Sequence, residues 1–133
     1  NLKTIKFLKN NFYKFNDVVV CGTRGWDTME EHSEEISNEK IFLRELNRLK
    51  ISIESAKKAG GEIVVILHYP PFDSDGLPNE FFDLMKEYYA DICVYGHLHG
   101  EDGHKNIREG IIDNIMVHCV SSDYMDFKLK RIL

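Results

Sequence analysis

The stretch "EIVVILHYPPF", residues 62–72, determines the fold of this chain. Its first part, "EIVVIL", is an almost continuous apolar run rich in β-branched side chains, which is typical of a strand buried on both faces of a sheet. Two prolines then end the strand. His68 lies just past the end of this run, and a second apolar run, "DICVY", is followed in the same way by His97 and His99 in "GHLHG".

Helical and extended patterns alternate on both sides of these two strands. Apolar residues recur at helical spacing over 38–59, with Ser37 as a candidate cap and two glycines as the stop. "NEFFDLMKEYY" predicts a short second helix, and "FYKF" and "VVVCG" predict a hairpin. "GIIDNIMVHCVS" and "FKLKRIL" read as terminal strands. This order predicts an α/β layered fold with a mixed sheet.

The composition favours one globular domain. The chain has 133 residues, 43% hydrophobic and 29% charged, and its net charge of −5 argues against non-specific binding to nucleic acid. No apolar run is long enough for a membrane span. Its three cysteines are an odd number without a CxxC motif, so we expect buried free thiols in a reducing compartment, the cytoplasm.

The histidines after the two strands are candidate metal ligands. Sites in sheets of this kind form past the carboxyl ends of the strands, so His68, His97 and His99 are expected at one rim. His97 and His99 would project from one face about 6–7 Å apart in extended backbone, which suits two metal ions better than one. Surface loop histidines are the alternative for this pair, and a half-buried strand-end residue is the alternative for His68.

Other histidine patterns do not fit. HExxH is absent, the HxHxDH pattern is not completed after Gly100, and the cysteines are not spaced for a zinc finger. His118 is expected to pack inside its strand, and His32 to lie exposed in an acidic loop.

Together, "ILHYPPF" and "YGHLHG" resemble the last two motifs of the calcineurin-like metallophosphoesterases. "CGTRGW", "FLRELNRLK" and "SSDYMDF" are similar to a bacterial branch that is often called Ser/Thr-phosphatase-like, and the likeness runs from Phe12 to Ile132. It implies part of a layered α-β-β-α sandwich with two divalent metal ions (Mn, Fe, Zn or Mg) that hydrolyses phosphate mono- or diesters. By position, His68 and His97 would bind one ion and His99 the other.

The N-terminal motifs of that family are missing from residues 1–133. There is no GD, no GNH with its acid histidine, and the one DxH, Asp102 to His104, follows "GHLH" and matches by coincidence. We therefore expect the chain to be the C-terminal portion of one metallophosphoesterase domain and inactive alone. The remainder of a longer enzyme, or a complementing chain, would finish the site.

Two further residues are candidates for the substrate side. Arg24, just past a strand, can meet a phosphate or brace against Trp26, and His104 can face substrate or lie solvated in a loop. The expected partner is a phosphate ester, with nucleic acid only as a possible substrate and no membrane. The alternative function is a non-catalytic metal-binding or interaction module that keeps the half-domain fold.

Overall fold

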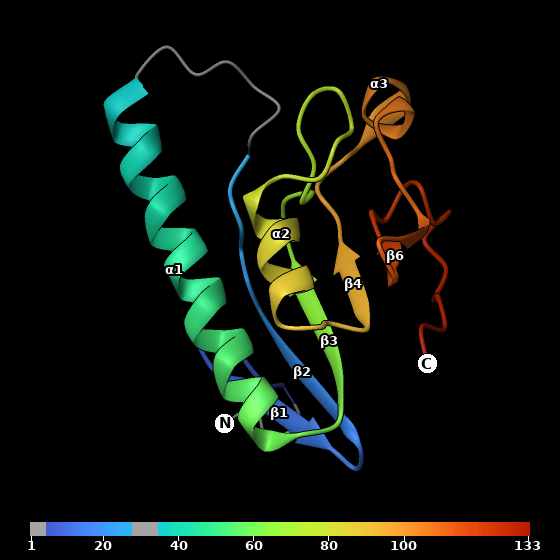
Figure 1. Ribbon diagram of the computed structural model, residues 1–133. Helices are drawn as coiled ribbons and strands as arrows, with labels where there is room; N and C mark the ends of the chain where they lie inside the picture. Colours follow the sequence, from blue (N-terminus) through green and yellow to red (C-terminus); the bar gives the residue numbers. More distant parts are fainter. Residues whose placement is uncertain (1–4, 28–34) are drawn as a thin grey trace.

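The structure of the chain is a computed structural model that describes residues 5–27 and 35–133. These residues form six strands and three helices around one sheet (Figure 1). The helices are α1 (Glu35–Ala59), α2 (Glu80–Glu87) and α3 (Gly100–Lys105). The strands are β1 (Phe12–Phe15), β2 (Val18–Thr23), β3 (Glu62–Leu67), β4 (Ile92–Tyr95), β5 (Gly110–Ile112) and β6 (Ile115–Cys119).

The sheet is mixed, with the order β1-β2-β3-β4-β6-β5. Its four inner strands are parallel, and β1 and β5 pair antiparallel at the two edges. Because the inner strands are parallel, the carboxyl ends of β2, β3, β4 and β6 meet at one rim of the sheet. The predicted α/β class, the hairpin of β1 and β2 and the two central strands are confirmed.

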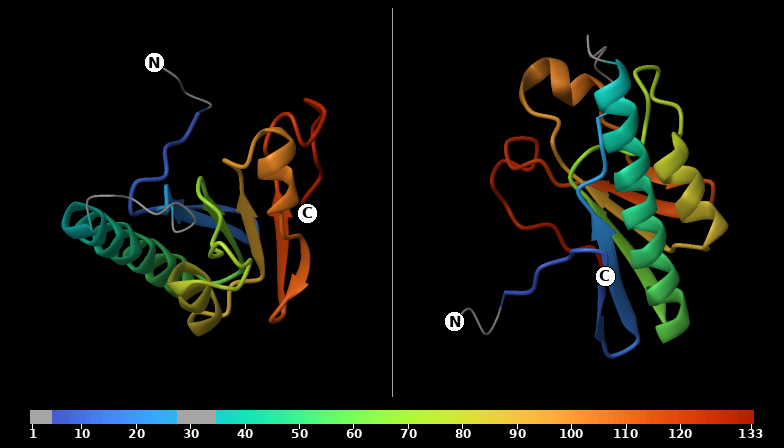
Figure 2. Two further views of the ribbon diagram at one scale, coloured as in Figure 1. Left: turned by 90° about the horizontal axis from the view of Figure 1, so that it is seen from above. Right: turned by 90° about the vertical axis from the view of Figure 1, so that its left-hand side faces the viewer.

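Both longer helices cover the same face of the sheet (Figure 2). Leu49 and Ile53 of α1 pack there without exposed surface, and Asn79 caps the start of α2 by accepting hydrogen bonds from two backbone N–H groups. The three cysteines are buried free thiols, as expected, and burial raises the pKa of Cys21 to about 12. This face holds the main core, which includes Val19, Ile63, Val65, Cys93, Tyr95, Val117 and Cys119.

The opposite face of the sheet is covered only in part by the described residues. Val64, Ile92 and Val94 form a small buried cluster, against which Ile132 of the C-terminal segment packs. The prediction of a strand over "FKLKRIL" is wrong, because this segment crosses the face of the sheet and does not lie beside an edge strand whose backbone groups it could pair with.

The predicted extended structure of "GIIDNIMVHCVS" is confirmed, and two other sequence predictions need correction. The segment "GIIDNIMVHCVS" forms the hairpin of β5 and β6, whose turn at Asp113 and Asn114 has positive φ at both residues. This hairpin joins the sheet that the other described strands form. The first helix begins at Glu35, so Ser37 lies within it, and α3 was expected to be a loop. His32 falls outside the described residues.

We predict that the isolated chain self-associates or binds a dye for apolar surface, because the sheet face opposite α1 and α2 is covered only in part. Ile66 and Met116 lie on this face and are 39% and 36% exposed, and Ile111, which pairs with Met116, is 72% exposed. These side chains add apolar surface to a face that Ile132 covers only in part, and large contiguous apolar patches are unusual on soluble monomers. Light scattering and dye fluorescence test the prediction, and a monodisperse monomer that binds no dye would show that the 133 residues close their own core.

Candidate metal centre

His68 and His97 meet at the rim of the sheet. His68 directly follows β3, His97 follows β4 by two residues, and the His97 Nδ1 atom lies 3.1 Å from His68 Nε2. The parallel pairing of β3 and β4 brings these two strand ends side by side. The predicted convergence of His68 and His97 is therefore present in the fold.

The backbone at His97 is strained. Its φ is +74°, and the Leu98 N–H donates to the Gly96 carbonyl oxygen at 2.9 Å across it. This is the γ-turn with positive φ, which is rare for a residue that has a side chain. Leu98 is buried and anchors the turn, and the turn directs the His97 imidazole toward His68. Strain held in place by its surroundings is typical of functional sites.

Neighbouring groups fix the position of the His68 strand end. The His68 and Tyr69 N–H groups both donate to the Arg24 carbonyl oxygen at 3.0 Å, which ties the end of β3 to the end of β2. The Tyr69 ring packs against His97, with ring centroids 4.4 Å apart. The backbone of His68 is thus held by hydrogen bonds, and the Tyr69 ring packs against both imidazoles.

The surroundings of His68 favour its neutral form. Partial burial lowers its pKa from the ordinary histidine value, and the positive charges of His97, Arg24 and His99 lower it further. Because these effects disfavour the imidazolium form, the metal-binding neutral imidazole is populated to lower pH than in an isolated histidine.

Asp27 lies behind His97. Its Oδ2 atom is 3.8 Å from His97 Nε2, and its side chain is only 11% exposed. The distance is long for a hydrogen bond, but a nearby carboxylate favours the proton of the neutral imidazole on Nε2. The lone pair of His97 then lies on Nδ1, the atom that faces His68.

His99 is oriented by Asp123. Its Nδ1 atom lies 2.6 Å from Asp123 Oδ1, and the other carboxylate oxygen accepts from the Gly100 N–H at 2.8 Å, at the start of α3. The bond from Gly100, followed by that from His99, lowers the pKa of Asp123 well below its usual range. As the carboxylate stays ionised, His99 donates from Nδ1 and keeps a lone pair on Nε2.

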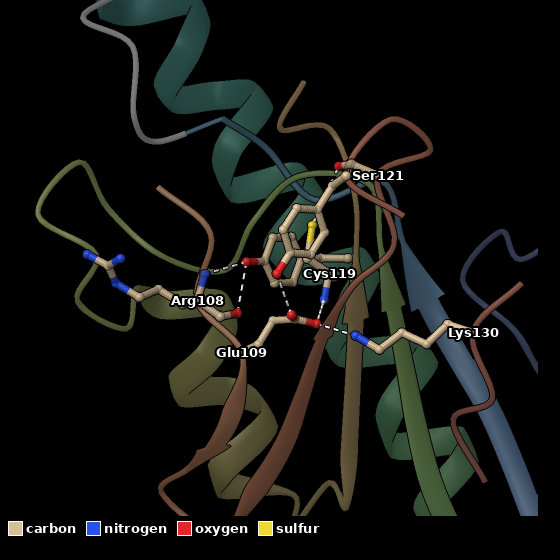
Figure 3. Close-up of polar contacts among 7 residues, drawn as sticks. Arg108, Glu109, Cys119, Ser121 and Lys130 are labelled. Atoms are coloured by element: carbon tan, nitrogen blue, oxygen red, sulfur yellow. Dashed lines mark hydrogen bonds and ion pairs between the residues drawn. The ribbon is translucent and has the colours of Figure 1, made fainter. Parts of the chain in front are cut away.

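A polar network anchors the segment that carries Asp123 (Figure 3). Glu109 accepts hydrogen bonds from the Cys119 N–H at 3.0 Å and the Tyr124 hydroxyl at 2.8 Å, and it pairs with Lys130. Burial raises the pKa of Glu109, but these bonds outweigh it and the pKa is lowered overall. Because Tyr124 follows Asp123 directly, the network fixes the carboxylate that orients His99.

The structure also places the two candidates for the substrate side. The guanidinium of Arg24 lies over the Trp26 ring at 4.7 Å, as the bracing alternative expected, and its NH2 atom is 3.7 Å from Glu45. His104 lies on α3, with its buried Nε2 atom 3.2 Å from Asp123 Oδ2 but not aligned for a hydrogen bond with the described residues. His118 is half-buried on β6, as predicted for a residue that packs within its strand.

Sequence reasoning missed Asp27 and Asp123. Both follow the carboxyl end of an inner strand, β2 and β6 respectively, which is the signal that selected His68. A search for every acidic residue within a few positions of a strand end would have found them. His99 and His104 were selected, but not the carboxylate that they share.

The donor set fits a metal ion only in part. Two nitrogens 3.1 Å apart match two ligands on one ion, because metal–nitrogen bonds of about 2.0–2.1 Å at angles of roughly 90–110° separate the nitrogens by about 2.8–3.4 Å. In the described part of the chain, no group of three or more His, Cys, Asp or Glu side chains is arranged to hold an ion. Any complete site therefore needs further ligands or a rearrangement of this rim.

Comparison with family models, with curated proteins and with solved structures gives no match. Across the described residues, no helix has the length and apolar character that spanning a membrane requires.

Proposed function

We propose that this chain forms the C-terminal part of a dinuclear metallophosphoesterase, in which His68 and His97 bind one divalent ion and His99 binds the other. The resemblance of "HYPPF" and "GHLHG" to that family suggests the reaction. The observation that supports it most is the pair of imidazole nitrogens, 3.1 Å apart at the sheet rim, on a strained turn.

Each histidine plays a distinct part in this proposal. His68 Nε2 and His97 Nδ1 present lone pairs to a shared point when the proton of His97 sits on Nε2, beside Asp27, and the proton of His68 sits on Nδ1. His99, held through Nδ1 by Asp123, presents Nε2 as the ligand of the second ion. Two divalent ions would supply a metal-activated water and neutralise charge on the phosphorus oxygens. The pH at which the histidines become charged sets the lower limit of activity.

The proposal requires partners for the chain. Three imidazoles cannot enclose two ions, so carboxylate and amide ligands must come from a preceding segment or a complementing chain. The uncovered sheet face beside Ile66 and Met116 is where such a segment would pack. A phosphate ester is the proposed substrate, and the buried free thiols favour a cytoplasmic setting.

We predict that the isolated chain shows no phosphoesterase activity and binds divalent metal weakly. It lacks the carboxylate ligands and the acid histidine that the reaction needs. Hydrolysis of p-nitrophenyl phosphate and bis-p-nitrophenyl phosphate with added Mn²⁺ tests this, together with His97→Ala. Robust hydrolysis by the pure chain that His97→Ala abolishes would show that these 133 residues contain a complete site.

A second candidate function is a metal-binding or interaction module without catalysis. Asp27 lies near His97, but in the described part of the chain no third side chain is arranged with His68 and His97 to hold an ion, and this favours the module. The two functions differ in the complemented protein. If the chain is joined to a segment with GD and GNH motifs and gains Mn²⁺-dependent hydrolysis, it is the half-enzyme, and if it binds that segment without hydrolysis, it is the module.

A further inference from the structure

A basic pocket lies beside the histidine rim. Its volume is about 520 Å³, within the range of small-molecule sites, and it is bounded by the end of β2, one turn of α1 and the segment before β1. The residues that line it are Leu8, Lys9, Asn10, Thr23, Arg24, Arg44, Glu45 and Arg48.

The pocket is organised around a buried carboxylate. Glu45 is 1% exposed, and its Oε2 atom accepts a hydrogen bond from the Thr23 hydroxyl at 2.9 Å. Its Oε1 atom lies 2.7 Å from Arg48, 3.3 Å from Arg44 and 3.7 Å from Arg24. A single oxygen atom of Glu45 thus lies close to three guanidinium groups, two from α1 and one from the residue that follows β2.

The three guanidinium groups carry more charge than Glu45 balances. Among the described residues that line the pocket, three arginines and one glutamate leave an excess of two positive charges, and Lys9 adds to it. The arginine side chains remain 42% to 54% exposed, and each guanidinium has five N–H donors, more than its contact with Glu45 requires. Like charges held this closely favour an anion between them, and the excess of two matches a phosphate group.

Arg24 connects this pocket to the rim. Its guanidinium approaches Glu45, while its carbonyl oxygen accepts from the N–H groups of His68 and Tyr69. Its positive charge also acts on His68. A ligand with one phosphate at the rim can therefore extend a second anionic group toward the pocket without crossing the core.

We propose that the pocket of Arg24, Arg44 and Arg48 binds a phosphate group of a small organic ligand. The assignment of this ligand as the substrate, which would then carry a second phosphate remote from the ester at the histidine rim, rests on the proposed function. The binding of phosphate in this pocket does not depend on the proposed function, because it needs neither the metal ions nor a completed rim.

The test is calorimetric titration of the chain with inorganic pyrophosphate, in low salt with EDTA to remove metal ions. Pyrophosphate is expected to bind, and Arg44→Gln is expected to weaken binding by about tenfold, the loss of one charge-assisted hydrogen bond. Lys9→Gln tests the pocket with a residue outside α1 and should also weaken binding. Circular dichroism confirms that each variant is folded.

Two matched controls separate this pocket from general charge and from the rim. Lys86→Gln removes the same charge from α2, where Lys86 pairs with Asp113, and should leave pyrophosphate binding unchanged. His97→Gly should also leave it unchanged, because the probe does not use the rim.

Four results would overturn the proposal: no binding of pyrophosphate, no loss in the folded Arg44 and Lys9 variants, an equal loss in Lys86→Gln, or a loss in His97→Gly. Tighter binding of a polyglutamate peptide in competition with pyrophosphate would assign the pocket to an acidic protein segment. If the chain complemented by a segment with GD and GNH motifs shows no Mn²⁺-dependent hydrolysis while pyrophosphate binding is intact, only the proposed function is overturned.

Discussion

Gly22→Ala is expected to prevent stable folding of the chain. Gly22 lies in β2 opposite Ile66 of β3, and its φ of +147° is one that residues with a side chain rarely adopt. A β-carbon at this position would lie 1.9 Å from the Ile66 carbonyl oxygen, a backbone atom that cannot move without disturbing the sheet. Backbone strain and overpacking together should cost roughly 3 kcal/mol or more, a large part of the stability of a small domain.

Gly60→Ala is the matched control for this substitution. Gly60 also has a positive φ, +68°, just past the end of α1, but a β-carbon there would meet no atom within 4 Å. Its expected cost is only about 1 kcal/mol. Urea denaturation followed by circular dichroism compares the two variants, and equal midpoints would mean that β2 and β3 are not paired as described.

His97→Gly is expected to weaken the binding of divalent metal by at least about a hundredfold. It removes one of two facing imidazole nitrogens, and even residues that only orient metal ligands contribute 10–100-fold to affinity. Glycine suits the positive φ at this position, so the turn is retained and the loss reports on the imidazole. Competition with a chromophoric chelator for Zn²⁺ at neutral pH measures the change.

His118→Ala serves as the control for histidine loss. His118 is half-buried on β6, where it pairs with Val94 across the sheet, and it has no part in the proposed site. Its removal should leave the Zn²⁺ affinity unchanged. If His118→Ala lowers the affinity as much as His97→Gly does, the metal is bound by scattered histidines and not at the rim.

The order of the elements and the meeting of His68 with His97 could be predicted because they follow from short-range patterns. Buried parallel strands read as apolar runs, and their carboxyl ends share one rim. The hairpin at Asn16 follows from local turn chemistry in the same way. These features need no knowledge of what lies across the sheet.

The parts that could not be predicted depend on long-range contacts. Apolar and basic residues alternate in the C-terminal segment as they do in an edge strand. In the structure, however, Ile132 packs over the cluster of Val64 and Val94 on the face of the sheet. Asp123 reaches His99 from 24 residues away, and Glu45 meets Thr23 from 22 residues away. Neither pairing has a periodic signal in the sequence, because each arises from where the sheet brings two loop or helix positions together.

The burial of Glu45 in the basic pocket could not be predicted from the sequence for the same reason. "FLRELNRLK" predicts a helix, and its apolar positions identify the buried stripe, which gives no reason to bury Glu45. Only the approach of α1 to the end of β2 shows why a carboxylate is tolerated there, since Thr23 and three arginines contact it.

Anomalous X-ray diffraction from crystals of this chain soaked in millimolar Mn²⁺ tests the metal centre most directly. The account predicts an anomalous peak at the rim, within about 2.0–2.3 Å of both His68 Nε2 and His97 Nδ1. The same crystals of His97→Gly should show no peak there. A map of the wild-type chain in which the rim holds no ion and the two imidazoles remain in direct contact would contradict the assignment of His68 and His97 as metal ligands.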